Sequence, residues 1–211
     1  GQANYAESFQ GVGTGTDSLG GPSSLVGRGW VFRNQSRVAS SGYSPYWTEY
    51  PSVGHVGSSL GHGAFAIWQT SQSKVSAWAI VPAIPNQQAG DPVTIWASAW
   101  TNAFGENNAS IECRYSPTGG TSTGSGENAV GDFTQVLFTI TRANTSGWTR
   151  FSANLPGAGR IAFRLVLGPF ATSSEFTGGF NIDSLQVGNP PPTPYPLPSA
   201  GQTVHWTTAH S

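Results

Sequence analysis

The chain has 211 residues, long enough for one domain with a single buried core, and its formal net charge is −1. Only 9% of the residues are charged and the nine basic residues stand singly, which argues against nucleic acid as a partner. No apolar run of about 18 residues is present to cross a membrane as a helix, whereas 37% hydrophobic and 12% aromatic residues predict a packed core.

Composition also suggests where the chain acts. Charged residues are scarce, so Ser, Thr, Asn, Gln and Gly must cover the surface, a composition typical of secreted and cell-surface proteins. The chain contains no methionine, so we expect it to be processed or excised from a longer chain, through a removed secretion signal or as a fragment. Cys113 is the single cysteine, and its alternating surroundings predict an inward-facing strand position without a disulfide.

Strand signals recur along the whole chain, whereas helical periodicity is nearly absent. The sequence is interrupted throughout by 28 glycines and 15 prolines. Runs rich in Val, Ile, Thr, Phe and Trp predict short strands at 4–10, 28–35, 63–69, 75–81, 92–101, 109–115, 133–141, 148–154, 159–167 and 178–187. This spacing predicts an all-β fold, a two-sheet antiparallel β-sandwich of the jelly-roll type.

Individual segments add detail to this prediction. Segment 93–100 (VTIWASAW) is apolar or small on both faces, which predicts a central strand covered on both sides. Segment 160–167 alternates more clearly, with one apolar face. The Gly-, Ser- and Thr-rich loops 11–27 and 116–131 are expected to be mobile unless other contacts hold them.

The composition changes abruptly after Val187, which places a domain boundary near Gly188. We therefore predict a sandwich domain at 1–188 and a Pro-rich tail at 189–211. The tail ends in an alternating TVHWTT segment, in which Val204 and Trp206 share one face of an extended strand. This strand would pair with an exposed sheet edge, either of its own domain or of a neighbouring copy, and the second case would propagate into a filament.

Four phrases of the sequence, in this order, form a recognisable series. They are YAESFQG (5–11), GWVFRNQS (29–36), VSAWAIVPAI (75–84), and a closing series that contains DFTQVL, GWTRFSANLPG, RIAFRLV and FNIDSLQV. Together they resemble the cleaved-adhesin or choice-of-anchor J domains, MAM-like jelly-roll modules found downstream of gingipain proteases. The resemblance spans about residues 5–187 and implies a non-catalytic, extracellular adhesive module that binds other surface proteins or copies of itself.

The same resemblance implies a calcium site between the first and last strands. It places Glu7 and Asp183 among the ligands, and Asn34 could add a neutral carbonyl oxygen. The chain departs from the family pattern at Asn34, Gln35 and Ser184, where acidic residues are usual, and this puts the calcium in doubt. The alternative is that Glu7 and Asp183 only accept backbone hydrogen bonds at strand ends.

The segment YSPYWTEY (43–50) is the most aromatic stretch outside the predicted strands. Aromatic faces beside hydrogen-bonding groups suit sugar recognition, so Tyr43, Tyr46, Trp47 and Tyr50 form a candidate ligand-binding patch and favour a carbohydrate-binding module as the alternative function. The competing interpretation is structural, because loop aromatics often cover an open end of a sandwich.

Signals for catalysis are weak. The GTSTG sequence at 120–124 matches a hydrolase nucleophile motif, but it lies in a low-complexity loop without the required strand and helix. The four histidines do not show the spacing of a zinc site. We therefore expect a binding or assembly protein and not an enzyme.

Overall fold

The computed structural model describes residues 3–37, 46–63, 74–100, 109–168 and 179–189. The helical segments in this part of the chain are α1 (Ser23–Gly27) and the 3-10 helix η1 (Arg142–Asn144). The strands there are β1 (Asn4–Glu7), β2 (Val31–Asn34), β3 (Thr48–Tyr50), β4 (Ser59–Gly63), β5 (Val75–Ile80), β6 (Pro92–Ala99), β7 (Ala109–Ser116), β8 (Gln135–Thr141), β9 (Thr149–Asn154), β10 (Arg160–Leu167) and β11 (Gly179–Gly188).

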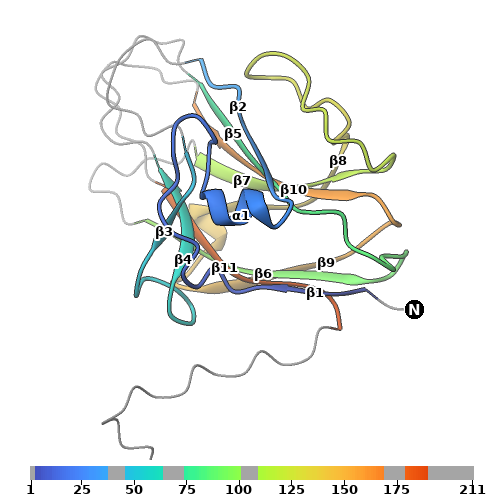
Figure 1. Cartoon of the computed structure of the whole chain (residues 1–211), viewed down its shortest axis with the longest axis horizontal. Coiled ribbons are helices and arrows are strands. Elements are labelled where there is room, and N and C mark those ends of the chain that lie inside the picture. Colours follow the sequence, from blue (N-terminus) through green and yellow to red (C-terminus); the bar gives the residue numbers. More distant parts are fainter. Residues whose placement is uncertain (1–2, 38–45, 64–73, 101–108, 169–178, 190–211) are drawn as a thin grey trace, which may run out of the picture.

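The strands form two antiparallel sheets that pack face to face (Figure 1). The six-stranded sheet has the order β3-β4-β11-β6-β9, and β1 also pairs with β11. The five-stranded sheet has the order β2-β5-β10-β7-β8. The predicted all-β, two-sheet antiparallel sandwich is thus confirmed.

Each predicted strand within the described residues has a counterpart close to its expected bounds. Two described strands were not predicted: β3, which lies in the segment interpreted as an aromatic loop, and β4, which shares only Gly63 with the strand predicted at 63–69. Residues 64–69 and the tail from 190 onward lie outside the described residues, so the domain boundary near Gly188 stays a prediction. The last described contact of β11 is a hydrogen bond from the Asn189 backbone N–H to the Ala3 carbonyl, at 3.1 Å.

The core fills the space between the sheets because successive strand residues point to opposite faces. In β7, Ile111, Cys113 and Tyr115 face the core, while Glu112 and Arg114 point outward. Cys113 is fully buried, as the sequence predicts. The large buried side chains that fill the space include Trp30, Trp47, Phe163, Phe180 and Ile95.

Loop 117–134 lies against the outer face of the five-stranded sheet. Phe133 in this loop is completely buried and packs on Trp78, with ring centroids 5.4 Å apart. Together with Ile80 and Ala162, these rings form a second apolar cluster, separate from the main core. The loop therefore seals this face of the sheet against water.

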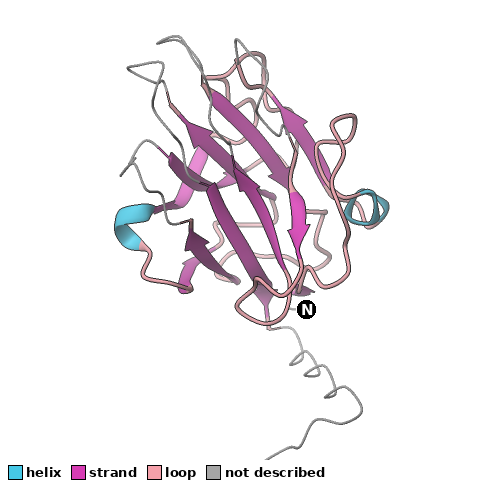
Figure 2. Ribbon diagram, turned by 90° about the vertical axis from the view of Figure 1, so that its left-hand side faces the viewer, coloured by secondary structure: helices cyan, strands magenta, loops and turns pink. Residues whose placement is uncertain are grey.

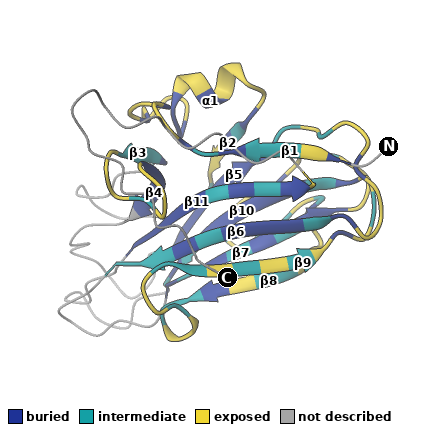
Figure 3. Ribbon diagram, turned by 90° about the horizontal axis from the view of Figure 1, so that it is seen from below, coloured by how far each residue is buried: buried dark blue, intermediate teal, exposed yellow. Residues whose placement is uncertain are grey.

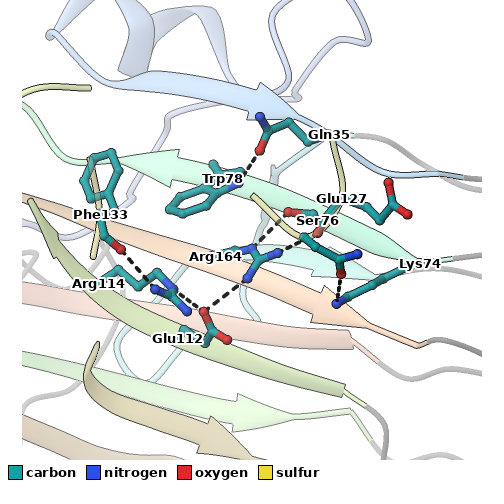
Figure 4. Close-up of polar contacts among 10 residues, drawn as sticks. Gln35, Lys74, Ser76, Trp78, Glu112, Arg114, Glu127, Phe133 and Arg164 are labelled. Carbon is teal, nitrogen blue, oxygen red and sulfur yellow. Dashed lines mark hydrogen bonds and ion pairs between the residues drawn. The ribbon is translucent and has the colours of Figure 1, made fainter. Parts of the chain in front are cut away.

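Polar contacts fix the same loop (Figure 4). Arg164, which is only 4% exposed, donates to the Glu127 carbonyl at 2.6 Å and to Ser76 Oγ at 2.9 Å. Arg164 and Arg114 both pair with the carboxylate of Glu112. Because Arg114 also donates to the Phe133 carbonyl at 3.0 Å, this loop is held in place along its length.

Loop 11–27 is held as well, and part of it forms α1. The Glu49 carboxylate accepts hydrogen bonds from the backbone N–H groups of Gly11 and Gly13, at 2.9 and 2.6 Å. The helical segments α1 and η1 are short and lie at opposite sides of the sandwich (Figure 2). Neither of these helices, within the described residues, has the length and apolar character needed to span a membrane.

Candidate binding face

The outer face of the six-stranded sheet carries partly exposed aromatic rings. In β6, Val93, Ile95 and Ala97 belong to the core, so Trp96 points to the opposite, outer face. Figure 3 views the sandwich from this side and shows both buried and partly exposed residues along β6. Trp100 continues the same spacing just after the strand, and both tryptophans are partly exposed.

The β3–β4 loop folds over this outer face. His55 in this loop lies flat on Trp96, with ring centroids 3.7 Å apart and an interplanar angle of 9°. Trp148, which precedes β9, meets the same imidazole edge-on at 6.4 Å and 65°. His55 is exposed and Trp148 is partly exposed, so the three rings form a corner open to solvent.

Asp183 holds the β3–β4 loop on the sheet. The register of β11 against β6 places Asp183 opposite Trp96, on the outer face, where the loop buries it completely. Its carboxylate accepts hydrogen bonds from the backbone N–H groups of Val56 and Ser184, at 2.9 and 2.6 Å. Burial raises the pKa of the Asp183 carboxyl, while these hydrogen bonds act in the opposite direction.

The local backbone permits this geometry. β11 contains a bulge between Asp183 and Gln186, and Ser184 within it has a left-handed φ of 52°. An extra residue in one strand re-aims the side chains next to it. Here the bulge turns the Ser184 N–H towards the Asp183 carboxylate, which is in turn directed at the loop.

A second aromatic pair lies further along the same face. Tyr50 of β3 meets Trp100 edge-on, at 5.5 Å and 69°. Trp100 Nε1 donates to Asn181 Oδ1 of β11 at 2.7 Å, which fixes the indole. Gly61 of β4 leaves room for these groups, because a Cβ there would lie 2.5 Å from Tyr50 Cε2. The term "aromatic row" below denotes Tyr50, Trp100, Trp96, His55 and Trp148.

The structure divides the aromatic patch predicted at 43–50. Trp47 is only 1% exposed and packs edge-on against His62 in the core, so its ring is not accessible to a ligand. For Trp47 the structural interpretation therefore applies. Tyr46 is partly exposed and lies near Gly15. Tyr50 belongs to the row, and Tyr43 lies outside the described residues.

The residues predicted to bind calcium do not form one cluster in the described conformation. Glu7 pairs with core-facing Leu185, whereas Asp183 points to the outer face of the same sheet. Glu7 accepts hydrogen bonds from the Phe9 N–H at 2.8 Å and from Arg28 at 3.0 Å.

Asn34, the third predicted ligand, ends β2 in the other sheet, and its side chain accepts from the Ser36 N–H at 3.1 Å. Within the described ranges, no group of three or more His, Cys, Asp or Glu side chains could hold a metal. The side-chain oxygens of these residues accept hydrogen bonds from separate N–H groups, and calcium binding stays a prediction. The tail residues Val204 and Trp206 lie outside the described residues.

Sequence reasoning missed most of the aromatic row. Segment 93–100 was expected to be covered on both sides, but Trp96 and Trp100 point outward and are partly exposed. Their even spacing within a strand was the available signal, because residues four apart lie on one face. His55 gave no signal, since its position depends on how an irregular loop folds back onto the sheet.

Comparison with known proteins identifies the fold. No protein-family model matches the sequence, and no curated protein matches it closely enough to count as a relative. The K1 cleaved adhesin domain of Lys-gingipain from Porphyromonas gingivalis W83 aligns with a TM-score of 0.51 and 18% identity, over 87% of this chain and 96% of that one. The K3 domain of the same protein aligns with a TM-score of 0.52 and 14% identity, over 89% and 98%.

A more distant match is the CBM22-1 xylan-binding domain of Paenibacillus barcinonensis Xyn10C, with a TM-score of 0.45 and 10% identity over 89% of this chain and 94% of that one. The resemblance to cleaved adhesin domains that the sequence phrases indicated is confirmed at the level of the jelly-roll fold.

Proposed function

We propose that the chain is a non-catalytic, extracellular binding module with an adhesive role, and that it binds through the outer face of its six-stranded sheet. The observation that carries this proposal is the difference between the two outer faces. Loop 117–134 covers the five-stranded sheet with Phe133 and a buried ion network. The six-stranded sheet instead presents the partly exposed aromatic row.

Exposed aromatic side chains favour a binding role for this face. Trp and Tyr supply large contact areas with few rotatable bonds, and they are enriched where binding energy is concentrated. The row is also preorganised, because Asp183 fixes the loop that carries His55 and Asn181 fixes Trp100. Little conformational entropy would therefore be lost on binding.

The groups with strongly shifted pKa values support a structural role for the interior and not a catalytic one. Burial lowers the pKa of His62 to about 3, so this core histidine is neutral at physiological pH. Burial raises the pKa of Cys113, which suppresses its thiolate. Both side chains belong to the packed interior, where a substrate has no access.

The test compares one face with the other. Labelled protein is titrated onto bacterial cells, epithelial cells and immobilised extracellular matrix, and saturable binding to at least one of them is expected. Ser152→Lys places a long charged side chain on the outer face beside β6 and should weaken that binding. Ser125→Lys, at an exposed position of the loop that covers the opposite sheet, is the matched control. Equal losses from the two variants, or binding to none of the surfaces, would refute the proposal.

Self-assembly through the tail is a second, more specific proposal, and it requires a sheet edge with which the tail segment can pair. β8 is the last strand of its sheet, and Val136 on it is 47% exposed. An edge strand with unpaired backbone groups can accept an additional strand. We propose this edge as the acceptor of the TVHWTT segment from a neighbouring copy.

A further inference from the structure

The aromatic row is elongated and not compact. Trp96 of β6 and Trp100, just after this strand, lie four residues apart along extended chain, which separates their Cα atoms by about 13 Å. His55 and Trp148 lie beside Trp96, and Tyr50 of β3 packs against Trp100, so the row extends beyond these two tryptophans. A ligand that contacts both ends must therefore be a chain of repeated flat units and not a single small ring.

The side chains between and beside the rings are mostly neutral and polar. The register of β6 with β9 and β11 places Thr94, Ser98, Ser152 and Gln186 on the same outer face. Thr94 Oγ1 and Ser152 Oγ lie 3.4 Å apart. Arg150, opposite Trp96, is the exposed charged residue that β9 adds to this face among the described residues.

We propose that the aromatic row is a binding platform for a neutral glycan chain, an inference that rests on the proposed function and names its ligand class. A pyranose ring has an apolar C–H face that stacks on an aromatic ring and hydroxyl groups at its edge that need hydrogen-bonding partners. The row supplies rings at intervals, and the neighbouring hydroxyl and amide groups supply partners. A face with so little charge complements a neutral, polyhydroxylated ligand better than an anionic one.

The corner formed by His55 and Trp148 is the most specific part of the platform. One face of the His55 ring covers Trp96, so the other face is the one available for stacking, with Trp148 beside it at 65°. The imidazole stays there because its loop is bonded to buried Asp183. His55 and Trp148 are thus contact residues, and Asp183 is a positioning residue.

The experiment is affinity electrophoresis of the whole chain through gels that contain soluble xylan, mannan, galactan or mixed-linkage β-glucan, together with a glycan array. The variants are Trp148→Ala, Trp100→Ala and the conservative Trp148→Phe. Leu19→Ala, at a 38% exposed position in the loop before α1, is the control. Thermal melting of each variant shows that it remains folded.

We expect retardation by at least one neutral polysaccharide. Trp148→Ala and Trp100→Ala should each weaken that binding at least about tenfold, because each removes a stacking surface. Trp148→Phe should recover part of the loss, and Leu19→Ala should bind normally. Binding to acidic glycans only would overturn the neutral ligand class, and unchanged binding by folded Trp148→Ala would overturn the location.

The same variants separate this inference from the proposed function. If no glycan binds, yet Trp148→Ala still loses adhesion to cells or matrix, the ligand is a protein; the glycan inference then fails while the binding face stands. If no glycan binds and adhesion is also absent or unaffected by the variants, both proposals fail.

Discussion

Replacing Asp183 with alanine tests whether this carboxylate holds the β3–β4 loop on the sheet. The change removes the acceptor for the backbone N–H groups of Val56 and Ser184. Leaving such donors without a partner costs about 1–3 kcal/mol, and removing a buried charge offsets part of that cost. We expect a net loss of about 1–2 kcal/mol, which lowers the Tm of a domain of this size by about 2–4 °C per kcal/mol.

The assay is thermal and urea unfolding of the wild type, Asp183→Ala and Asp17→Ala. Asp17 is an exposed carboxylate, so its removal should change stability by no more than about 0.5 kcal/mol. His55 should also leave Trp96 in Asp183→Ala, visible as a change in the Trp96 indole NMR signal. Wild-type stability in Asp183→Ala, with an unchanged indole signal, would refute the role assigned to Asp183.

The difference in stability between wild type and Asp183→Ala should depend on pH, and the raised pKa of Asp183 sets the direction of that dependence. The folded-state pKa of Asp183 is raised above its ordinary value of 3.8, so the native state binds more protons than the unfolded state between the two values. The contribution of Asp183 to stability therefore increases as the pH falls through the raised pKa, and it stops changing below the unfolded value. The stability gap between wild type and Asp183→Ala should widen on acidification through this window, whereas a narrowing gap would contradict the assignment.

Three further predictions concern the rest of the molecule. Arg164→Ala should lower the free energy of unfolding by about 1–3 kcal/mol in urea titrations, because Ser76 Oγ and the Glu127 carbonyl lose their donor while Glu112 keeps Arg114. A loss below about 0.5 kcal/mol would show that loop 117–134 is held by other contacts. Excess chelator should leave the melting curve unchanged if N–H donors alone satisfy Glu7 and Asp183, whereas a calcium ion between them predicts a lower Tm that calcium restores. Deleting residues 189–211 should leave a folded domain that no longer assembles, as measured by light scattering, and an unchanged oligomeric state would refute strand exchange.

The strands could be predicted from the sequence because their signals are local. The alternation of apolar and polar side chains around Cys113 and along 160–167 determines which residues face the core, independently of distant parts of the chain. β3 was not predicted because it has only three residues and lies within an aromatic segment. α1 could not be predicted because its five residues are too few to show a helical period.

The binding face could not be predicted because it depends on which loop covers which sheet. Both Trp78 and Trp96 are strand tryptophans that point away from the main core. Trp78 is buried because Phe133 and its loop lie on it, whereas Trp96 lies under His55 of the β3–β4 loop and stays partly exposed. No local pattern distinguishes these outcomes, because each is decided by contacts between residues distant in the sequence.

The most direct test of the glycan-binding face is the response of the tryptophan indole N–H signals to an oligosaccharide, recorded by two-dimensional NMR on labelled protein. The chain has eight tryptophans, and three of them, Trp30, Trp47 and Trp78, are buried in apolar clusters. Titration with the oligosaccharide of the polysaccharide bound most tightly should shift the signals of Trp96, Trp100 and Trp148 in a saturable manner and leave those three unchanged. Saturable binding that leaves the signals of Trp96, Trp100 and Trp148 in place would contradict the account.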